Sequence, residues 1–205
     1  MDSKKLVIFA GPNGSGKSTI VNNAIVLGQC PAKFICPDNF VAREDKENEE
    51  AYRIAQREAE QVRHTLIAQG EPFSFETVLS IKDKLEFIKY AKYHGYHVHV
   101  VYVTTRSPEI NLERVKIRVA QGGHNVPTNK VLSRYEKSMG LMFDVVREAH
   151  RADVYDNSED RPQFVAAKIN ETYCFCKRPP DWLEKYLISK VVQHKLPIGT
   201  IKNRK

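Results

Sequence analysis

The sequence predicts an α/β fold in which a parallel β-sheet is flanked by helices. Short apolar runs of strand length alternate with longer segments whose apolar residues recur at helical spacing, which is the pattern of βαβ units. The first apolar run, 6–10, leads directly into a glycine-rich loop and then into a segment compatible with a helix, 18–27. A length of 205 residues suits one domain with its own core. In such a sheet, ligands bind at the carboxyl ends of the strands.

The loop after the first predicted strand carries the most specific motif of this half of the chain. Gly11, Gly16, Lys17 and Ser18 fill the fixed positions of G-x-x-x-x-G-K-S/T, the Walker A motif. Its glycines let backbone N–H groups turn toward a phosphate, its lysine neutralises phosphate charge, and its hydroxyl ligates Mg²⁺. The sequence therefore predicts a phosphate-binding loop (P-loop) for ATP and Mg²⁺, with Ser18 as the metal ligand. The predicted nucleotide-binding residues of this loop are Gly11, Pro12, Asn13, Gly14, Ser15, Gly16, Lys17, Ser18 and Thr19.

Two further strand and helix units follow the loop. The segment 34–36 predicts a second strand, and 51–66, with apolar residues on one face, predicts a long helix that stops at Gly70. The segment 73–75 predicts a third strand. Ser80, three residues ahead of an aspartate, has the pattern of a capping box for the next helix.

The alternation continues through the second half of the chain. The valine-rich segment 97–103 predicts a strand, and Ser107, directly before a proline, predicts the N-cap of a helix. That helix ends at the glycine pair 122–123. A further helix is predicted over 132–143, and the segment 152–155 predicts the last central strand.

The C-terminal part has a different composition. The segment 164–175 fits either a pair of edge strands or a strand with a turn, and a short helix is predicted over 181–192. The end, 197–205, is a candidate for disorder. We therefore divide the chain into a main P-loop domain, 1–176, and a basic C-terminal extension, 177–205.

The positive charge of the protein is concentrated in that extension. The formal net charge is +7, and the segment 177–205 holds eight Lys or Arg against two acidic residues. A basic segment can contact nucleic acid or an acidic partner, but it is more commonly a solvated end of the chain. The extension has few aromatic residues on which bases could stack, so its charge alone does not favour nucleic-acid binding.

Cysteine usage and hydropathy indicate a cytoplasmic protein. The four cysteines lack the spacing of a zinc ribbon, and Cys174 and Cys176 alternate with aromatic residues as on one face of a strand. Reduced thiols are the default for such a pattern. The N-terminal residues do not have the pattern of a signal peptide, and no stretch approaches the roughly 18 apolar residues of a membrane span. We expect no membrane contact.

Acidic and polar residues follow the second and third predicted strands. Asp38 comes after the second, and Glu76 and Thr77 after the third, so all three are expected at the edge of the sheet that holds the P-loop. A carboxylate there can accept the proton of a substrate hydroxyl that attacks the γ-phosphate. The alternative for Asp38 is a turn residue, because Pro-Asp-Asn is ordinary turn chemistry. GTPase signatures of the N-K-x-D kind are absent from the sequence, which favours a kinase.

Arginines surround the glycine pair 122–123. Arg114 and Arg118 are four residues apart, on one face of the predicted helix, and Arg134 lies beyond the glycines. Kinases of small molecules close a lid that brings arginines onto the migrating phosphoryl group. The segment 114–135 is the predicted lid. The alternative is a solvated basic face paired with nearby glutamates.

Together these motifs resemble the zeta toxin and UDP-N-acetylglucosamine kinase family of P-loop kinases, over roughly 6–158. The resemblance rests on the sequence segments Gly-Pro-Asn-Gly-Ser-Gly-Lys-Ser-Thr, Pro-Asp-Asn-Phe at 37–40, Phe-Glu-Thr at 75–77, Gly-Gly-His-Asn-Val-Pro at 122–127 and Asp-Asn-Ser at 156–158. The glycine-histidine segment, with an Arg-Tyr pair downstream, is the most specific of these.

The resemblance implies a reaction and a role for each residue. Proteins of this family phosphorylate the 3′-hydroxyl of the amino sugar in a nucleotide sugar with ATP, or GTP in some members, and Mg²⁺. It implies Asp38 as the general base, Lys17, Arg118 and Arg134 at the transferred phosphate, and Glu76, Thr77 and Arg114 with Asp38 at the substrate. Asn157 and Ser158 are implied at the adenine. Some members are toxins held by an antitoxin, so an antitoxin is a candidate partner.

Two other functions fit the same motifs. The first is another small-molecule, nucleoside or polynucleotide kinase, the last favoured slightly by the basic extension. The second is a nucleotide-gated switch that binds ATP without phosphoryl transfer and uses its arginines at a protein interface.

Overall fold

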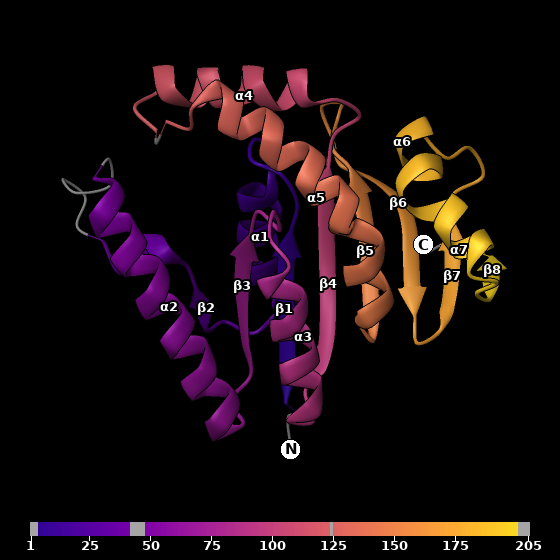
Figure 1. Ribbon diagram of the computed structural model, residues 1–205, viewed down its shortest axis with the longest axis horizontal. Helices are drawn as coiled ribbons and strands as arrows, with labels where there is room; N and C mark the ends of the chain where they lie inside the picture. Colours follow the sequence, from indigo (N-terminus) through magenta and orange to yellow (C-terminus); the bar gives the residue numbers. More distant parts are fainter. Residues whose placement is uncertain (1–3, 42–47, 124, 201–205) are drawn as a thin grey trace.

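The computed structural model describes residues 4–41, 48–123 and 125–200, and its centre is a β-sheet. Among these residues the sheet has eight strands in the order β2-β3-β1-β4-β5-β6-β7-β8 (Figure 1). The strands are β1 (Lys5–Ala10), β2 (Phe34–Ile35), β3 (Phe73–Thr77), β4 (His97–Thr104), β5 (Arg151–Asp156), β6 (Gln163–Ile169), β7 (Thr172–Phe175) and β8 (Ile198–Thr200). The strands β1 to β5 pair in parallel, whereas β6 is antiparallel to both of its neighbours. The predicted α/β fold is confirmed.

Helices cover both faces of this sheet. They are α1 (Lys17–Val26), α2 (Glu49–Gln69), α3 (Asp83–Tyr93), α4 (Pro108–Ala120), α5 (Thr128–Glu148), α6 (Asp181–Leu183) and α7 (Ser189–Gln193), with the short helices η1 (Pro37–Asn39) and η3 (Glu184–Ile188). The smaller core joins α1 to one face, and the larger core joins α2, α3 and α5 to the other. Helix α4 lies across the carboxyl edge of the sheet, above the P-loop (Figure 1).

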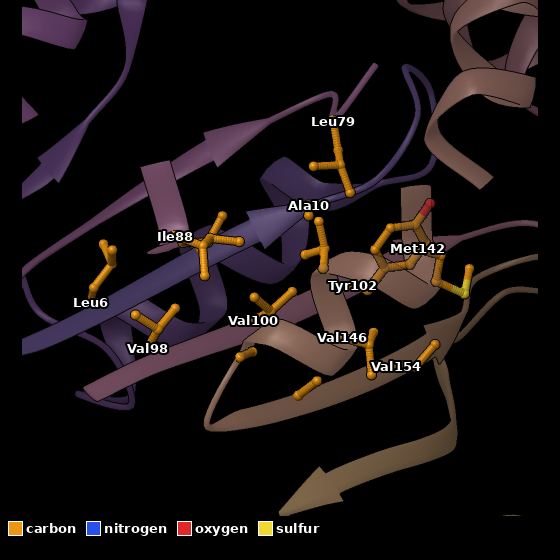
Figure 2. Close-up of a cluster of buried hydrophobic side chains, with 14 of the residues drawn as sticks. Leu6, Ala10, Leu79, Ile88, Val98, Val100, Tyr102, Met142, Val146 and Val154 are labelled. Carbon is orange, nitrogen blue, oxygen red and sulfur yellow. The ribbon is translucent and has the colours of Figure 1, made fainter. Parts of the chain in front are cut away.

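The central strands are buried on both faces. Side chains alternate across a strand, so β1 sends Leu6 and Ile8 into the larger core and Val7 and Phe9 into the smaller one. Figure 2 shows the larger core, where β1 and β4 side chains meet those of α3 and α5. Continuous apolar runs such as 6–10 are therefore explained by a parallel sheet with helices on both sides.

Most of the predicted helix ends agree with the structure. Helix α2 ends at Gly70, whose φ of 73° is the left-handed conformation that favours glycine, and Ser107 is the N-cap of α4 with a proline in its first turn. The capping box predicted at Ser80 is wrong. Helix α3 begins at Asp83, so this carboxylate occupies the first turn, where it interacts favourably with the helix dipole.

The C-terminal segment belongs to the same core as the rest of the chain. Of its side chains, Trp182, Leu183, Leu187 and Val191 are buried in the larger core, where η3 packs against α5. The expected disorder from 197 is wrong for β8, which pairs in parallel with β7, and residues 201–205 lie outside the described residues. Edge strands β6 and β7 form the pair that the sequence allowed as one of two alternatives. No helix among the described residues is long and apolar enough to cross a membrane.

Candidate active site

The P-loop connects β1 to α1 and is packed tightly against two other elements. Gly11 has a φ of 140°, and a Cβ atom there would lie 1.9 Å from the backbone oxygen of Val103 on β4. Gly14 has a φ of 76°, and its Cβ would lie 2.4 Å from the backbone oxygen of Asn111 on α4. Only glycine fits these positions, because the neighbouring atoms belong to backbone that cannot move aside cheaply.

Two buried asparagines hold the loop from outside. Asn157, after β5, donates from its side chain to the carbonyl oxygen of Ser15 at 2.8 Å. Asn111 donates to the carbonyl oxygen of Asn13 at 2.5 Å and accepts from the hydroxyl of Thr105. The sequence analysis missed Asn111. Its only signal is a polar residue one turn before Val115 on the buried stripe of α4.

Lys17 is the buried cation of the site. Its side chain is 4% exposed, and its Nζ atom donates to the carbonyl oxygen of Pro12 at 2.9 Å and lies 3.7 Å from Oε1 of Glu76. Burial lowers the pKa of the Lys17 ammonium, Glu76 acts in the opposite direction, and the charge of Arg118 lowers it further. The charge of Arg118, in the predicted lid, therefore acts on the lysine that is expected to contact the phosphates.

Glu76 also faces the first turn of α1. The Ser18 hydroxyl donates to Oε2 of Glu76 at 3.1 Å. A hydroxyl and a carboxylate oxygen are the hard donors that Mg²⁺ takes, usually with several waters retained, so the pair fits that ion. The structure thus places Glu76 beside the P-loop. Thr19, the next residue of α1, is exposed.

One P-loop atom lacks a partner among the described residues. The Ser15 hydroxyl is buried and has no hydrogen-bond partner there. Buried polar groups are almost always paired, so an orphaned hydroxyl beside Gly11 is consistent with a loop built to receive a polar ligand.

A second group of side chains lies around η1, which follows β2 at the edge of the sheet that holds the P-loop. Asp38 lies in η1, at the carboxyl end of β2, and α2 packs against η1. Burial raises the pKa of Tyr52 on α2 to about 12, with Asp38, Cys36 and Glu76 adding to the shift and Arg134 opposing it. The charges of Asp38, Glu76 and Arg134 therefore all act on Tyr52, although no sequence motif pointed to it.

Thr77 has a local role in the structure. Its hydroxyl accepts a hydrogen bond from the backbone N–H of Leu79 at 3.2 Å, in a turn where Leu79 has a φ of 56°. Its carbonyl oxygen accepts from the Gly11 N–H at 3.2 Å, which ties β3 to the start of the P-loop. A contact of Thr77 with substrate stays a prediction.

The three lid arginines reach different places. Arg134 on α5 donates to the side-chain oxygen of Asn13 at 3.5 Å and so reaches the P-loop, whereas Arg118 is exposed and its charge acts on Lys17. Arg114 instead donates to the carbonyl oxygen of Asn157 at 2.6 Å. This bond holds Arg114 at the turn after β5, away from Asp38.

The turn after β5 is itself well held. The Ser158 hydroxyl accepts from the backbone N–H of Arg106 at 2.8 Å and donates to a carboxylate oxygen of Asp156. These bonds join the ends of β4 and β5 beside the P-loop, where Asn157 and Ser158 were predicted to meet the adenine. Adenine contact stays a prediction. His124 of the lid lies outside the described residues.

Comparison with known proteins places the chain in a family. Residues 6–141 match the family model described as an AAA domain, which is well over half of the chain. An uncharacterized protein of Haemophilus influenzae is 33% identical over 133 residues, which cover 64% of this chain and 92% of that protein.

Solved structures share the fold at low sequence identity. The AvrRxo1-ORF1:AvrRxo1-ORF2 complex with sulphate ions superposes with a TM-score of 0.69 at 18% identity, over 90% of this chain and 63% of that chain. This chain thus spans just under two thirds of that neighbour. The PezAT chromosomal toxin-antitoxin system of Streptococcus pneumoniae gives a TM-score of 0.60 at 15% identity, over 95% of this chain and 85% of that chain. The chain belongs to the AAA domain family and shares its α/β fold, a mostly parallel sheet flanked by helices, with these solved structures.

Proposed function

We propose that this protein is a kinase that transfers the γ-phosphate of ATP to a hydroxyl group of a small metabolite. The observation that carries the proposal is a P-loop whose Lys17 and Ser18 both contact Glu76. Asp38 follows β2 at the same edge of the sheet, and Arg134 donates to the P-loop residue Asn13. Phosphoryl transfer needs positioned charge more than covalent chemistry, and this edge of the sheet supplies both an acid–base group and cations.

Each charged group then has a distinct task. Lys17 binds the phosphates, Ser18 and Glu76 hold Mg²⁺, and Arg118 and Arg134 stabilise charge on the transferred phosphoryl group. When bound, Mg²⁺ neutralises charge on the phosphate oxygens. Asp38 accepts the proton of the attacking hydroxyl. The segment 114–135 acts as the lid that carries two of these arginines.

The proposed acceptor is the 3′-hydroxyl of a UDP-activated amino sugar, with UDP-N-acetylglucosamine as the leading candidate. The support is the resemblance of the motifs at 37–40, 75–77 and 122–127 and the likeness in fold to the PezAT toxin-antitoxin system. An antitoxin-like partner chain belongs to the same proposal.

The test is phosphoryl transfer from ATP and Mg²⁺ to a panel of metabolites that includes UDP-N-acetylglucosamine, read by mass spectrometry. The matched variants are Asp38→Asn and Asp144→Asn, because Asp144 is a surface carboxylate 3.6 Å from Arg147, far along α5 from the P-loop. We expect a phosphorylated nucleotide sugar with the wild type and Asp144→Asn, and none with Asp38→Asn. Transfer to another acceptor would retain the kinase and reject the substrate, and no transfer to any acceptor would reject the kinase.

A further inference from the structure

A buried arginine beneath the acceptor side of the site has no assigned role. Arg63 on α2 is 5% exposed, and its Cζ atom lies 4.9 Å from the centre of the Phe75 ring and 5.9 Å from that of Phe87. A guanidinium that stacks on rings uses its flat faces, and its N–H donors stay directed outward in the plane.

One of those donors is buried and unmatched within the described part of the chain. Nε of Arg63 is buried without a hydrogen-bond partner, and the side chain forms no salt bridge there. The acidic residue one turn earlier, Glu60, lies 3.3 Å from Lys84 instead. Burial lowers the pKa of Arg63, with Glu60 and Cys36 only partly opposing the shift. A buried cation without a matched acceptor is costly, and a bound anionic ligand is one arrangement that would offset this cost.

The preferred direction of a long helical side chain would carry Arg63 toward the site. Long side chains of a helix lean toward its N-terminus, and the N-terminal end of α2 is the one next to η1 and Asp38. The neighbouring residues on this face of α2, Ala55 and Ala59, are small and fully buried. Their side chains are therefore too short to block the path of Arg63 toward the N-terminal end of α2.

Strand register shows how close Arg63 is to the carboxyl ends of β2 and β3. Phe75, the ring under Arg63, pairs with Ile35 of β2. The residue after Phe75 is Glu76, and Cys36 after Ile35 leads within two residues to Asp38. The side chain of Glu76 leaves the opposite face of β3, toward Ser18, so the nearer of the two is the β2 end, where the charge of Cys36 acts on Arg63.

We propose that Arg63 binds an anionic group, a carboxylate or a phosphate, of the phosphoryl acceptor. This inference rests on the proposed kinase function and narrows its substrates to acidic metabolites. A planar guanidinium matches either oxyanion with two parallel hydrogen bonds, and the ring of Phe75 fixes its plane. A neutral analogue of the same acceptor would leave the buried donors unpaired and would bind more weakly.

The test is calorimetric binding of matched probes to protein saturated with a non-hydrolysable ATP analogue, so that the P-loop is filled. One pair is UDP-N-acetylglucosamine and N-acetylglucosamine, which tests a phosphate, and the other is gluconate and glucose, which tests a carboxylate. We expect the wild type to bind one anionic probe at least tenfold more tightly than its neutral partner. Arg63→Met should lose at least tenfold in affinity for that probe alone, with partial recovery in Arg63→Lys.

The control is Arg147→Met, because Arg147 also lies over an aromatic ring, that of Phe143 at 5.2 Å, but is half exposed at the far end of α5. Arg63→Met should retain its affinity for the ATP analogue, and its Tm should not fall below that of Arg147→Met, since it removes an unpaired charge.

Unchanged probe affinity in Arg63→Met, or an absence of anion binding by the wild type, would overturn the inference. Anion binding through Arg63 without phosphate transfer would reject the kinase function but support the anion site. Phosphate transfer to neutral acceptors alone would support the kinase function but reject the anion site.

Discussion

At the scale of residues, two neighbouring groups hold the buried charge of Lys17 at the predicted phosphate site. Its ammonium is almost enclosed, with a pKa lowered by burial, and its partners are the Pro12 carbonyl and the Glu76 carboxylate. We expect Lys17→Ala to reduce kcat/KM for phosphoryl transfer by at least about 100-fold, because the transition state loses a preorganised charge contact. The measurement is steady-state transfer from ATP and Mg²⁺ to the acceptor that the metabolite panel identifies. Lys33→Ala, at an exposed pair with Glu71, is the control, and near-normal turnover of Lys17→Ala would reject the P-loop assignment.

Asp153 on β5 gives a residue-scale prediction for pH. Burial alone would raise the pKa of its carboxyl, but His99 at 2.9 Å and Arg151, also at 2.9 Å, outweigh it and lower the pKa. A lowered carboxyl pKa stabilises the folded state above the ordinary value of 3.8, and this stability is lost as the pH falls through the lowered value. We expect the free energy of unfolding of Asp153→Asn to lie below that of the wild type above pH 3.8, and the gap to close at lower pH.

Urea unfolding across pH measures that gap. The control is Glu113→Gln, which breaks an exposed pair with Lys116 at 3.8 Å that is expected to contribute little. A gap for Asp153→Asn that stays constant down to the most acidic condition would contradict the linkage.

At the scale of elements, the turn between α4 and α5 positions a lid arginine. The N–H of Gly123 donates to the Arg118 carbonyl oxygen at 2.9 Å, and a Cβ atom at Gly123 would lie 2.6 Å from Cγ of Arg118 and 2.9 Å from that oxygen. Gly123, of the glycine pair within the predicted lid, is therefore packed directly against Arg118.

Gly123→Ala should displace the Arg118 side chain and lower kcat for phosphoryl transfer by about tenfold or more, because a small misplacement of a catalytic cation is costly. Gly140→Ala on α5 is the matched control, since no atom lies within 4 Å of its added Cβ. The control should stabilise the protein by roughly 0.5–1 kcal/mol, as alanine does in a helix interior, without loss of kcat. Equal kcat in the two variants would show that the turn does not position Arg118.

At the scale of the whole molecule, the C-terminal segment packs into the larger core on one face of the sheet. The Trp182 indole N–H donates to Oδ2 of Asp156 at 2.8 Å, which ties this segment to the turn beside the P-loop. Adjacent valines give a clean test, because Val191 is fully buried whereas Val192 is 59% exposed. Val191→Ala should lower the free energy of unfolding by roughly 1.5–3 kcal/mol, and Val192→Ala should change it by less than about 0.5 kcal/mol. Urea denaturation of both variants measures this, and equal small effects would mean that the segment is not part of the cooperative core.

The sequence alone determined the parallel α/β core, the P-loop and the order in which chemistry-bearing residues follow the strands. These features are local: a strand buried on both faces is a continuous apolar run, and a phosphate loop needs glycine, lysine and a hydroxyl at fixed spacing. The resemblance then gave specific roles to Asp38 and the arginines, which their places after the second strand and around the glycine pair had already made candidates.

Only the tertiary structure decided which side chains meet. Asn111, Tyr52 and Arg63 carry no motif, and their surroundings come from α4 and α2 packing against elements far away in the sequence. Packing likewise turned Glu76 toward Ser18 and Arg114 toward Asn157. The physical reason is that a sequence fixes the spacing and the face of a side chain within its own element, whereas burial and hydrogen-bond partners depend on how separate elements are brought together.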